Sequence, residues 1–118
     1  MARFISFKKK YAEKILAGEK TATIRLSDFF RENEIYDVRV GWFKPSLCRV
    51  KIIRKKRKRL KDIGREEILK DGFSNLEEFQ RAWTSIYGRW DPEQQVWVYE
   101  FRLLNPENSA RKFKNGAF

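Results

Sequence analysis

The stretch ILAGEKTATIR, residues 15–25, joins a helical pattern to a strand pattern through a glycine. Before it, the apolar residues at positions 11, 12, 15 and 16 form one stripe at helical spacing. Gly18 suits the left-handed position that commonly follows the last turn of a helix. After it, residues 21–26 alternate threonine and arginine with apolar residues, which predicts a strand with one polar and one apolar face.

Alternation of apolar and polar residues predicts further strands on both sides of this stretch, over residues 2–7, 35–43, 47–57 and 95–104. In the strand over 95–104 the apolar residues Trp97, Tyr99, Phe101 and Leu103 share one face, so we expect it to lie in the core.

Two helices are predicted between the third and last of these strands. A short one spans residues 65–70 and ends at Gly72. The longer one begins near Ser74 and Glu77, which have the spacing of a capping box. Its apolar stripe consists of Leu76, Phe79, Trp83 and Ile86.

The order β-α-β-β-β-α-β, with five to six strands and two main helices, predicts an α+β fold. We expect a small mixed or antiparallel β-barrel with helices at its side or end. One domain is expected over residues 1–104. Residues 105–118 form a basic tail without periodicity, which we expect to fray or drape over the surface.

Composition excludes several classes of protein and site. The 118 residues are 42% hydrophobic and 15% aromatic, enough for one folded core and too apolar for a disordered chain. Histidine is absent, which excludes imidazole catalysis and histidine metal sites. Cys48 is the single cysteine, so intrachain disulfides and thiolate zinc clusters are excluded. We expect no metal and no cofactor.

The chain carries no apolar run of the length needed to span a membrane and no secretory signal at its start. We therefore predict a cytoplasmic protein with no membrane association.

Positive charge is concentrated in one segment. The net charge is +11. Residues 51–61 hold eight of the 27 basic residues and no acidic residue. Such a block attracts polyanions, because displacing counterions from phosphates drives non-specific nucleic-acid binding. RNA, DNA or an acidic membrane would each fit. An edge strand that uses its charge against aggregation is the alternative. The basic residues predicted to contact phosphates are Arg54, Lys55, Lys56, Arg57, Lys58 and Arg59.

The best candidate site lies on the polar face of the strand in the opening stretch. Lys20, Thr21, Thr23 and Arg25 place an ammonium, two hydroxyls and a guanidinium beside the end of a helix. Lysine offers a compact cation, arginine a planar fork and threonine a hydroxyl that donates and accepts. The structural alternative is a strand whose cations simply reach solvent.

The same stretch resembles the hallmark of the ASCH domain, a branch of the PUA-like superfamily. Residues 71–79, DGFSNLEEF, are similar to the family's second helix start, and residues 96–101, VWVYEF, to its last strand. The resemblance covers about residues 4–104. It implies a PUA-like β-barrel whose cleft, beside the first helix, binds RNA or nucleotides, with Lys20, Thr21, Thr23 and Arg25 at the cleft.

For base stacking in that cleft, the candidates are Trp42, Phe43, Trp90 and Tyr99, each of which could instead pack in the core. We expect RNA as the partner, with a modified nucleoside or a protein partner as alternatives.

An enzymatic alternative also follows from the resemblance. Similar bacterial proteins are amidohydrolases that act on N4-acetylcytidine, with a lysine, a threonine and a glutamate implied as the catalytic set. Lys20 and Thr23 match the first two, and Asp71 stands where a glutamate is expected, with Glu66 and Glu67 nearby. Ribonuclease activity has also been proposed in the family. Whether the chain is an enzyme is left open by the sequence.

Overall fold

The computed structural model describes residues 3–41 and 44–104. The strands are β1 (Phe4–Ser6), β2 (Ala22–Arg25), β3 (Ile35–Arg39), β4 (Cys48–Arg59) and β5 (Gln95–Leu103). The helices are α1 (Lys9–Leu16), the 3-10 turn η1 (Leu60–Asp62), α2 (Arg65–Lys70) and α3 (Leu76–Tyr87). The order of elements predicted from the sequence is confirmed. The predicted tail over 105–118 lies outside the described residues.

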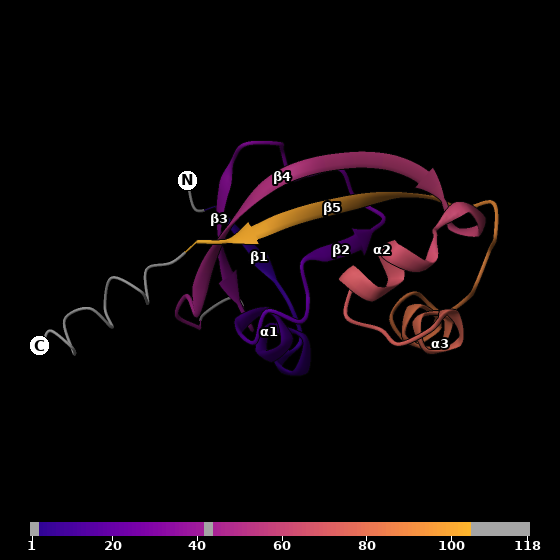
Figure 1. The fold of residues 1–118 in the computed structure, drawn as a ribbon, viewed down its shortest axis with the longest axis horizontal. Coiled ribbons are helices and arrows are strands. Elements are labelled where there is room, and N and C mark those ends of the chain that lie inside the picture. Colours follow the sequence, from indigo (N-terminus) through magenta and orange to yellow (C-terminus); the bar gives the residue numbers. More distant parts are fainter. Residues whose placement is uncertain (1–2, 42–43, 105–118) are drawn as a thin grey trace, which may run out of the picture.

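The strands form one sheet in the order β1-β3-β4-β5-β2. Strand β1 pairs with β3 in parallel, and the other neighbours are antiparallel. Figure 1 shows β4 and β5 as long arched strands, with α1 below one end of them and α2 and α3 below the other.

The predicted closed barrel is wrong, because the sheet is open. Its two outer strands, β1 and β2, have three and four residues and are not hydrogen-bonded neighbours in the described sheet. Between them the Ser6 carbonyl of β1 accepts a hydrogen bond from the Arg25 side chain of β2 at 2.6 Å, so a side chain stands where a backbone ladder would close the sheet.

Strand β5 is buried on both faces. Tyr99 and Phe101 belong to one hydrophobic cluster, together with residues of α1, β1, β3 and β4. Val96 and Val98 belong to a second cluster, which lies under α2 and α3. Adjacent strand residues point to opposite sides of a sheet, so β5 separates the two cores. The predicted core face is confirmed, and the second buried face was not foreseen.

Two details of α3 differ from the prediction. Its N-cap is Asn75, whose side chain accepts a hydrogen bond from the Glu78 amide at 2.8 Å, so the cap lies one residue later than expected. Phe79 and Trp83 are buried, but Leu76 and Ile86 are about half exposed. The helix has twelve residues, and its stripe drifts away from the core at both ends.

Candidate functional site

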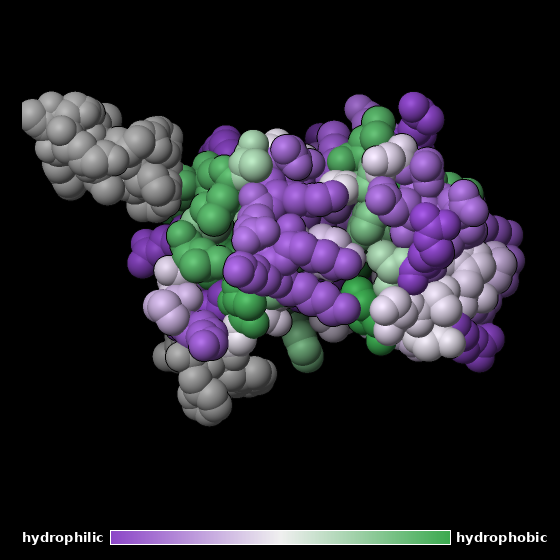
Figure 2. Space-filling view, turned by 90° about the horizontal axis from the view of Figure 1, so that it is seen from below, coloured by the Kyte–Doolittle hydropathy of each residue, from purple (hydrophilic) through white to green (hydrophobic). Residues whose placement is uncertain are grey.

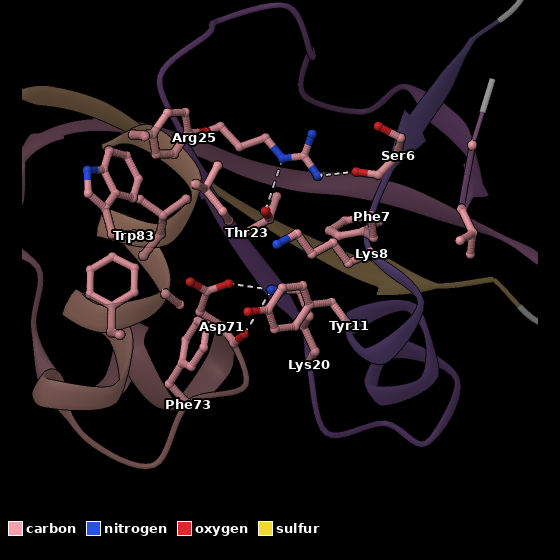
Figure 3. A pocket seen from close by; sticks show the side chains of 17 residues that line it. Ser6, Phe7, Lys8, Tyr11, Lys20, Thr23, Arg25, Asp71, Phe73 and Trp83 are labelled. Atoms are coloured by element: carbon pink, nitrogen blue, oxygen red, sulfur yellow. Dashed lines mark hydrogen bonds and ion pairs between the residues drawn. The ribbon is translucent and has the colours of Figure 1, made fainter. Parts of the chain in front are cut away.

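A cavity of about 370 Å³ lies where the open sheet leaves β1 and β2 unpaired. Its lining comes from the end of β1, from α1, from β2, from the residues that follow β3, from the turn after α2, and from α3. Of the residues predicted for the site, Lys20, Thr23, Arg25 and Asp71 line this cavity. Figure 3 shows these side chains facing one another across it.

Lys20 and Asp71 form a buried ion pair at the base of the site. The Lys20 Nζ donates to the Asp71 carboxylate and, at 2.8 Å, to the Asp71 backbone carbonyl. Each residue is only 4% exposed. The ammonium also lies 5.6 Å from the ring centre of Phe7 and 5.5 Å from that of Tyr11. Asp71, which the sequence placed in the alternative catalytic set, does enter the cavity.

The turn after α2 holds this pair in place. The amide of Thr21 donates to the Lys70 carbonyl at 2.7 Å, which ties the loop before β2 to the end of α2. Gly72 has a φ of +96°, a conformation that other residues rarely adopt. A Cβ at this position would lie in ordinary van der Waals contact with the side chains of Lys14 and Lys20, at 3.4 to 3.5 Å. The backbone conformation of the turn, rather than lack of space, therefore favours glycine here.

Burial opposes the charges of the pair. It lowers the pKa of Lys20, and the neighbouring Asp71 carboxylate works in the opposite direction. Burial also raises the pKa of Asp71 to about 6, against the effect of Lys20. A carboxyl group with this pKa changes its charge within the range in which many enzymes and binding proteins work.

Arg25 joins the two unpaired strands. Its Nη2 donates to the Ser6 carbonyl of β1 at 2.6 Å, and its Nε donates to the Thr23 hydroxyl on β2 at 3.1 Å. The guanidinium lies 4.7 Å from the ring centre of Phe7. Burial lowers the pKa of Arg25. The hydroxyl of Thr23 accepts from Arg25, so its own proton is directed elsewhere.

Aromatic side chains form the walls of the cavity. Phe7, Tyr11, Phe73, Trp83 and Tyr87 line it, with Trp83 and Tyr87 in contact at 4.2 Å between ring centres. Helical spacing in the sequence predicts Tyr11 and Trp83 as members of apolar stripes that face the core. A stripe residue at the margin of a core can face a cavity, and periodicity alone does not distinguish the two cases.

The predicted stacking residues are elsewhere. Tyr99 is fully buried, and its hydroxyl donates to the Ser27 carbonyl at 2.6 Å, so of its two predicted roles core packing is confirmed and base stacking is not. Trp90 packs edge-on against Phe79 and does not line the cavity. Trp42 and Phe43 lie outside the described residues. Thr21 is exposed and does not line the cavity either.

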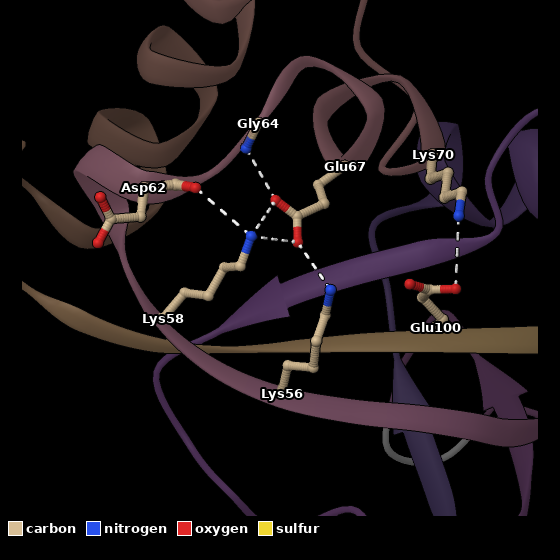
Figure 4. Close-up of polar contacts among 7 residues, drawn as sticks. All are labelled: Lys56, Lys58, Asp62, Gly64, Glu67, Lys70 and Glu100. Carbon is tan, nitrogen blue, oxygen red and sulfur yellow. Dashed lines mark hydrogen bonds and ion pairs between the residues drawn. The ribbon is translucent and has the colours of Figure 1, made fainter.

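The basic residues of β4 divide between the two faces of the strand. Lys56 and Lys58 point toward α2 and pair with Glu67 at 3.4 and 3.0 Å (Figure 4). Burial works to raise the pKa of Glu67, but hydrogen bonds from the Gly64 amide and Lys58 hold it below its ordinary value.

On the other face, Lys55 lies 4.8 Å and Arg57 5.9 Å from the ring centre of Trp97. Lys55 also donates to the Asp28 carbonyl at 2.8 Å, and Arg59 pairs with Glu93 at 3.4 Å. Arg54 is exposed. The basic segment is thus bound largely to its own protein, and none of its residues lines the cavity.

Within the described residues, no group of three acidic or cysteine side chains is arranged to hold a metal ion. No helix in that part of the chain has the length and apolarity needed to cross a membrane.

These features define a small α+β domain with a charged, aromatic-walled cavity at the opening of its sheet. The model of the ASCH domain family matches residues 3–105, and the chain therefore belongs to the ASCH domain family. The resemblance seen in the sequence is confirmed.

Solved structures support the fold. An ASCH domain from Lactobacillus crispatus superposes with a TM-score of 0.71 at 15% identity, covering 86% of this chain and 76% of that one. Protein EF3133 from Enterococcus faecalis gives 0.68 at 12% identity over 88% and 81%. The hypothetical protein PH0355 gives 0.68 at 19% identity over 88% and 100%. No curated protein matches the chain significantly in sequence.

Proposed function

We propose that the cavity binds one nucleotide unit of an RNA chain. The observation that carries the proposal is the meeting of Lys20, Thr23, Arg25 and Asp71 in one aromatic-walled cavity of about 370 Å³. This volume lies at the small end of the range for ligand sites and suits a ligand of nucleoside size. Membership of the ASCH family, in which RNA binding is expected, supports it.

The chemistry of the lining supports a base with an attached phosphate. Aromatic walls such as Tyr11 and Tyr87 offer faces on which a base stacks. The Asp71 carboxylate has lone pairs beyond those that Lys20 uses, so it can accept from an exocyclic amino group. Arg25 supplies a fixed cation for phosphate, and the Thr23 hydroxyl can donate to a base oxygen.

The test is an equilibrium titration with single-stranded RNA, structured RNA and duplex DNA of equal length, each at several salt concentrations. We expect RNA binding to exceed DNA binding and to persist at physiological salt. Arg25→Gln should weaken RNA binding by at least about tenfold, since hydrogen bonds to charged groups contribute about 1.5–3 kcal/mol.

Arg89→Gln is the matched control, because Arg89 is exposed, carries the same charge and does not line the cavity. Arg25→Lys keeps the charge but loses the planar fork, and it separates the two contributions. Equal affinities for parent, Arg25→Gln and Arg89→Gln proteins would exclude the cavity as the binding site.

Hydrolysis of an acylated nucleoside is the second candidate, and the Lys20–Asp71 pair beside Thr23 favours it. The reaction would add water to the amide of N4-acetylcytidine and release cytidine and acetate. Lys20, whose pKa is lowered by burial, would act as the neutral amine and accept a proton from the Thr23 hydroxyl or from water, and Asp71 would stabilise the ammonium that forms.

The assay for this candidate is mass spectrometry of cytidine after incubation with N4-acetylcytidine. Cytidine should form with the parent protein and not with Thr23→Val or Lys20→Met. Failure to detect cytidine after prolonged incubation with a panel of N4-acyl cytidines would reject the hydrolase and leave the binding proposal in place.

A further inference from the structure

A second depression of about 450 Å³ lies between α1 and α3 and continues the cavity. Lys8, Tyr11 and Phe73 line both, so the two form one connected surface. We call this depression the α1–α3 groove. A polymer with one unit in the cavity would have to leave it along a neighbouring surface, and this groove adjoins it directly.

The α1–α3 groove is strongly cationic. Lys8, Lys10, Lys14 and Arg81 line it, with Glu78 as the acidic residue among them. The Glu78 carboxylate accepts a hydrogen bond from the Ser74 amide at 2.6 Å, which fixes it at the start of α3. Figure 2, which views the molecule from the side of the helices, shows hydrophilic side chains gathered across the middle of this face.

Most of these cations are open to solvent. Lys8, Lys10 and Arg81 are exposed, whereas Lys14 is partly buried and donates to the Gly72 carbonyl at 2.6 Å. Arg81 lies 3.5 Å from Glu77, but both side chains are more than two-thirds exposed, so this pair holds Arg81 weakly.

The start of α1 is electrostatically unfavourable for the helix itself. Lys8 is the N-cap and makes no side-chain capping bond, and the first turn has no acidic residue. Lys8, Lys9 and Lys10 instead place three cations where the helix dipole favours anions. Residues that are unfavourable for the local structure are expected at functional sites. A phosphate group at this point would compensate the three charges.

Strand β4 offers fewer unpaired cations to a phosphate, although its sequence is more basic. Lys56 and Lys58 share Glu67, Arg59 pairs with Glu93, and Lys55 donates to a backbone carbonyl. A phosphate would have to compete with partners that are already present.

We propose that the α1–α3 groove binds the sugar–phosphate backbone of a single RNA strand that has one nucleotide in the cavity, and that the basic segment of β4 does not. The inference rests on the proposed RNA binding. It assigns the phosphate contacts to Lys8, Lys10 and Arg81, none of which the sequence analysis selected.

The test compares two double variants with the same loss of charge from exposed side chains. Lys10→Gln with Arg81→Gln removes two cations from the groove, and Arg54→Gln with Arg57→Gln removes two from β4. Binding of a labelled short single-stranded RNA is measured by fluorescence anisotropy across a salt series. Thermal unfolding verifies that both variants fold, and Arg25→Gln reports on the cavity.

For single strands, log K falls with log salt by about 0.7 for each phosphate contact. The groove variant should therefore lose about 1.4 from the slope and bind at least about tenfold more weakly at low salt. The β4 variant should keep the parent's slope and affinity within about twofold.

Four outcomes decide the matter. Loss of slope in the groove variant alone supports the inference. Loss in the β4 variant alone, equal loss in both variants, or loss in neither overturns it. If the parent binds RNA and Arg25→Gln weakens binding, the proposed function stands in those three cases. If the parent does not bind RNA at physiological salt, the proposed function fails as well.

Discussion

The buried pair of Lys20 and Asp71 makes the first prediction, because both groups are 4% exposed and each is the other's charge partner. Asp71→Ala leaves the Lys20 ammonium with the carbonyl of residue 71 and the faces of Phe7 and Tyr11. Removing one partner of a buried pair costs about 3–5 kcal/mol. In a domain of this size, each kcal/mol lowers Tm by about 4–8 °C, so Tm should fall by at least about 12 °C.

The double variant Lys20→Met with Asp71→Leu distinguishes the free energy of the interaction between the two residues from their separate contributions to stability. Replacing a buried ion pair by apolar residues of similar volume is often neutral or stabilising, so the double variant should be more stable than Asp71→Ala. With Lys20→Met and Asp71→Leu as the single variants, the cycle should give a coupling of at least about 2 kcal/mol.

Thermal unfolding measures the change in Tm, and urea unfolding measures the free energies; both are followed by tryptophan fluorescence at pH 7. Glu77→Ala is the control, because its exposed pair with Arg81 should change stability by well under about 1 kcal/mol. A cost below about 1 kcal/mol for Asp71→Ala would refute the reasoning. So would a double variant that loses the sum of its single variants.

Three further predictions concern pH, backbone and the α2 contact. Below the Asp71 pKa of about 6 the carboxyl group is neutral and the cavity more positive, so a phosphodiester dinucleotide of uridine, whose bases have no amino group to donate to Asp71, should bind more tightly as pH falls from 7 to 5; calorimetry should show this in the parent and not in Asp71→Asn. Gly72→Ala and Gly18→Ala should each lower the free energy of unfolding in urea by about 1–2 kcal/mol, because both glycines have positive φ and neither added Cβ comes closer than van der Waals contact; a loss near zero in either variant would contradict this. Glu67 has a lowered pKa, so its stabilising contribution is present above its ordinary value of 4.5 and is lost as pH falls through the folded-state value; Glu67→Gln should destabilise at pH 7, and a difference that persisted at pH 2 would refute this.

The sequence predicts the order of elements and half of the site, because both depend on local pattern. The spacing of apolar residues and the position of Gly18 predict α1, the turn after it and the polar face of β2. That face carries Thr23 and Arg25. Asp71 lies about fifty residues further along, and only the family resemblance brought it to the same cavity.

The misassigned features depend on tertiary partners. Alternation along β5 shows which residues share a face, but it does not say that α2 and α3 cover the opposite face over Val96 and Val98. A run of lysines and arginines predicts a charged surface, but its neutralisation by Glu67 and Glu93 requires contacts between distant segments. Charge density in the sequence therefore does not show which cations already have partners within the protein.

The open sheet explains why the cavity lies between β1 and β2. In a closed barrel, the backbone groups of β1 and β2 would hydrogen-bond to each other. Here the Ser6 carbonyl of β1 accepts a hydrogen bond from the Arg25 side chain instead. The guanidinium spans the opening and also donates to Thr23, so one side chain both joins the strands and lines the cavity. A ligand phosphate that drew Arg25 away from Ser6 would loosen the link between β1 and β2. If the proposed ligand does so, ligand binding and the spacing of the two edges are coupled through Arg25, and we expect variants at this residue to change affinity and stability together.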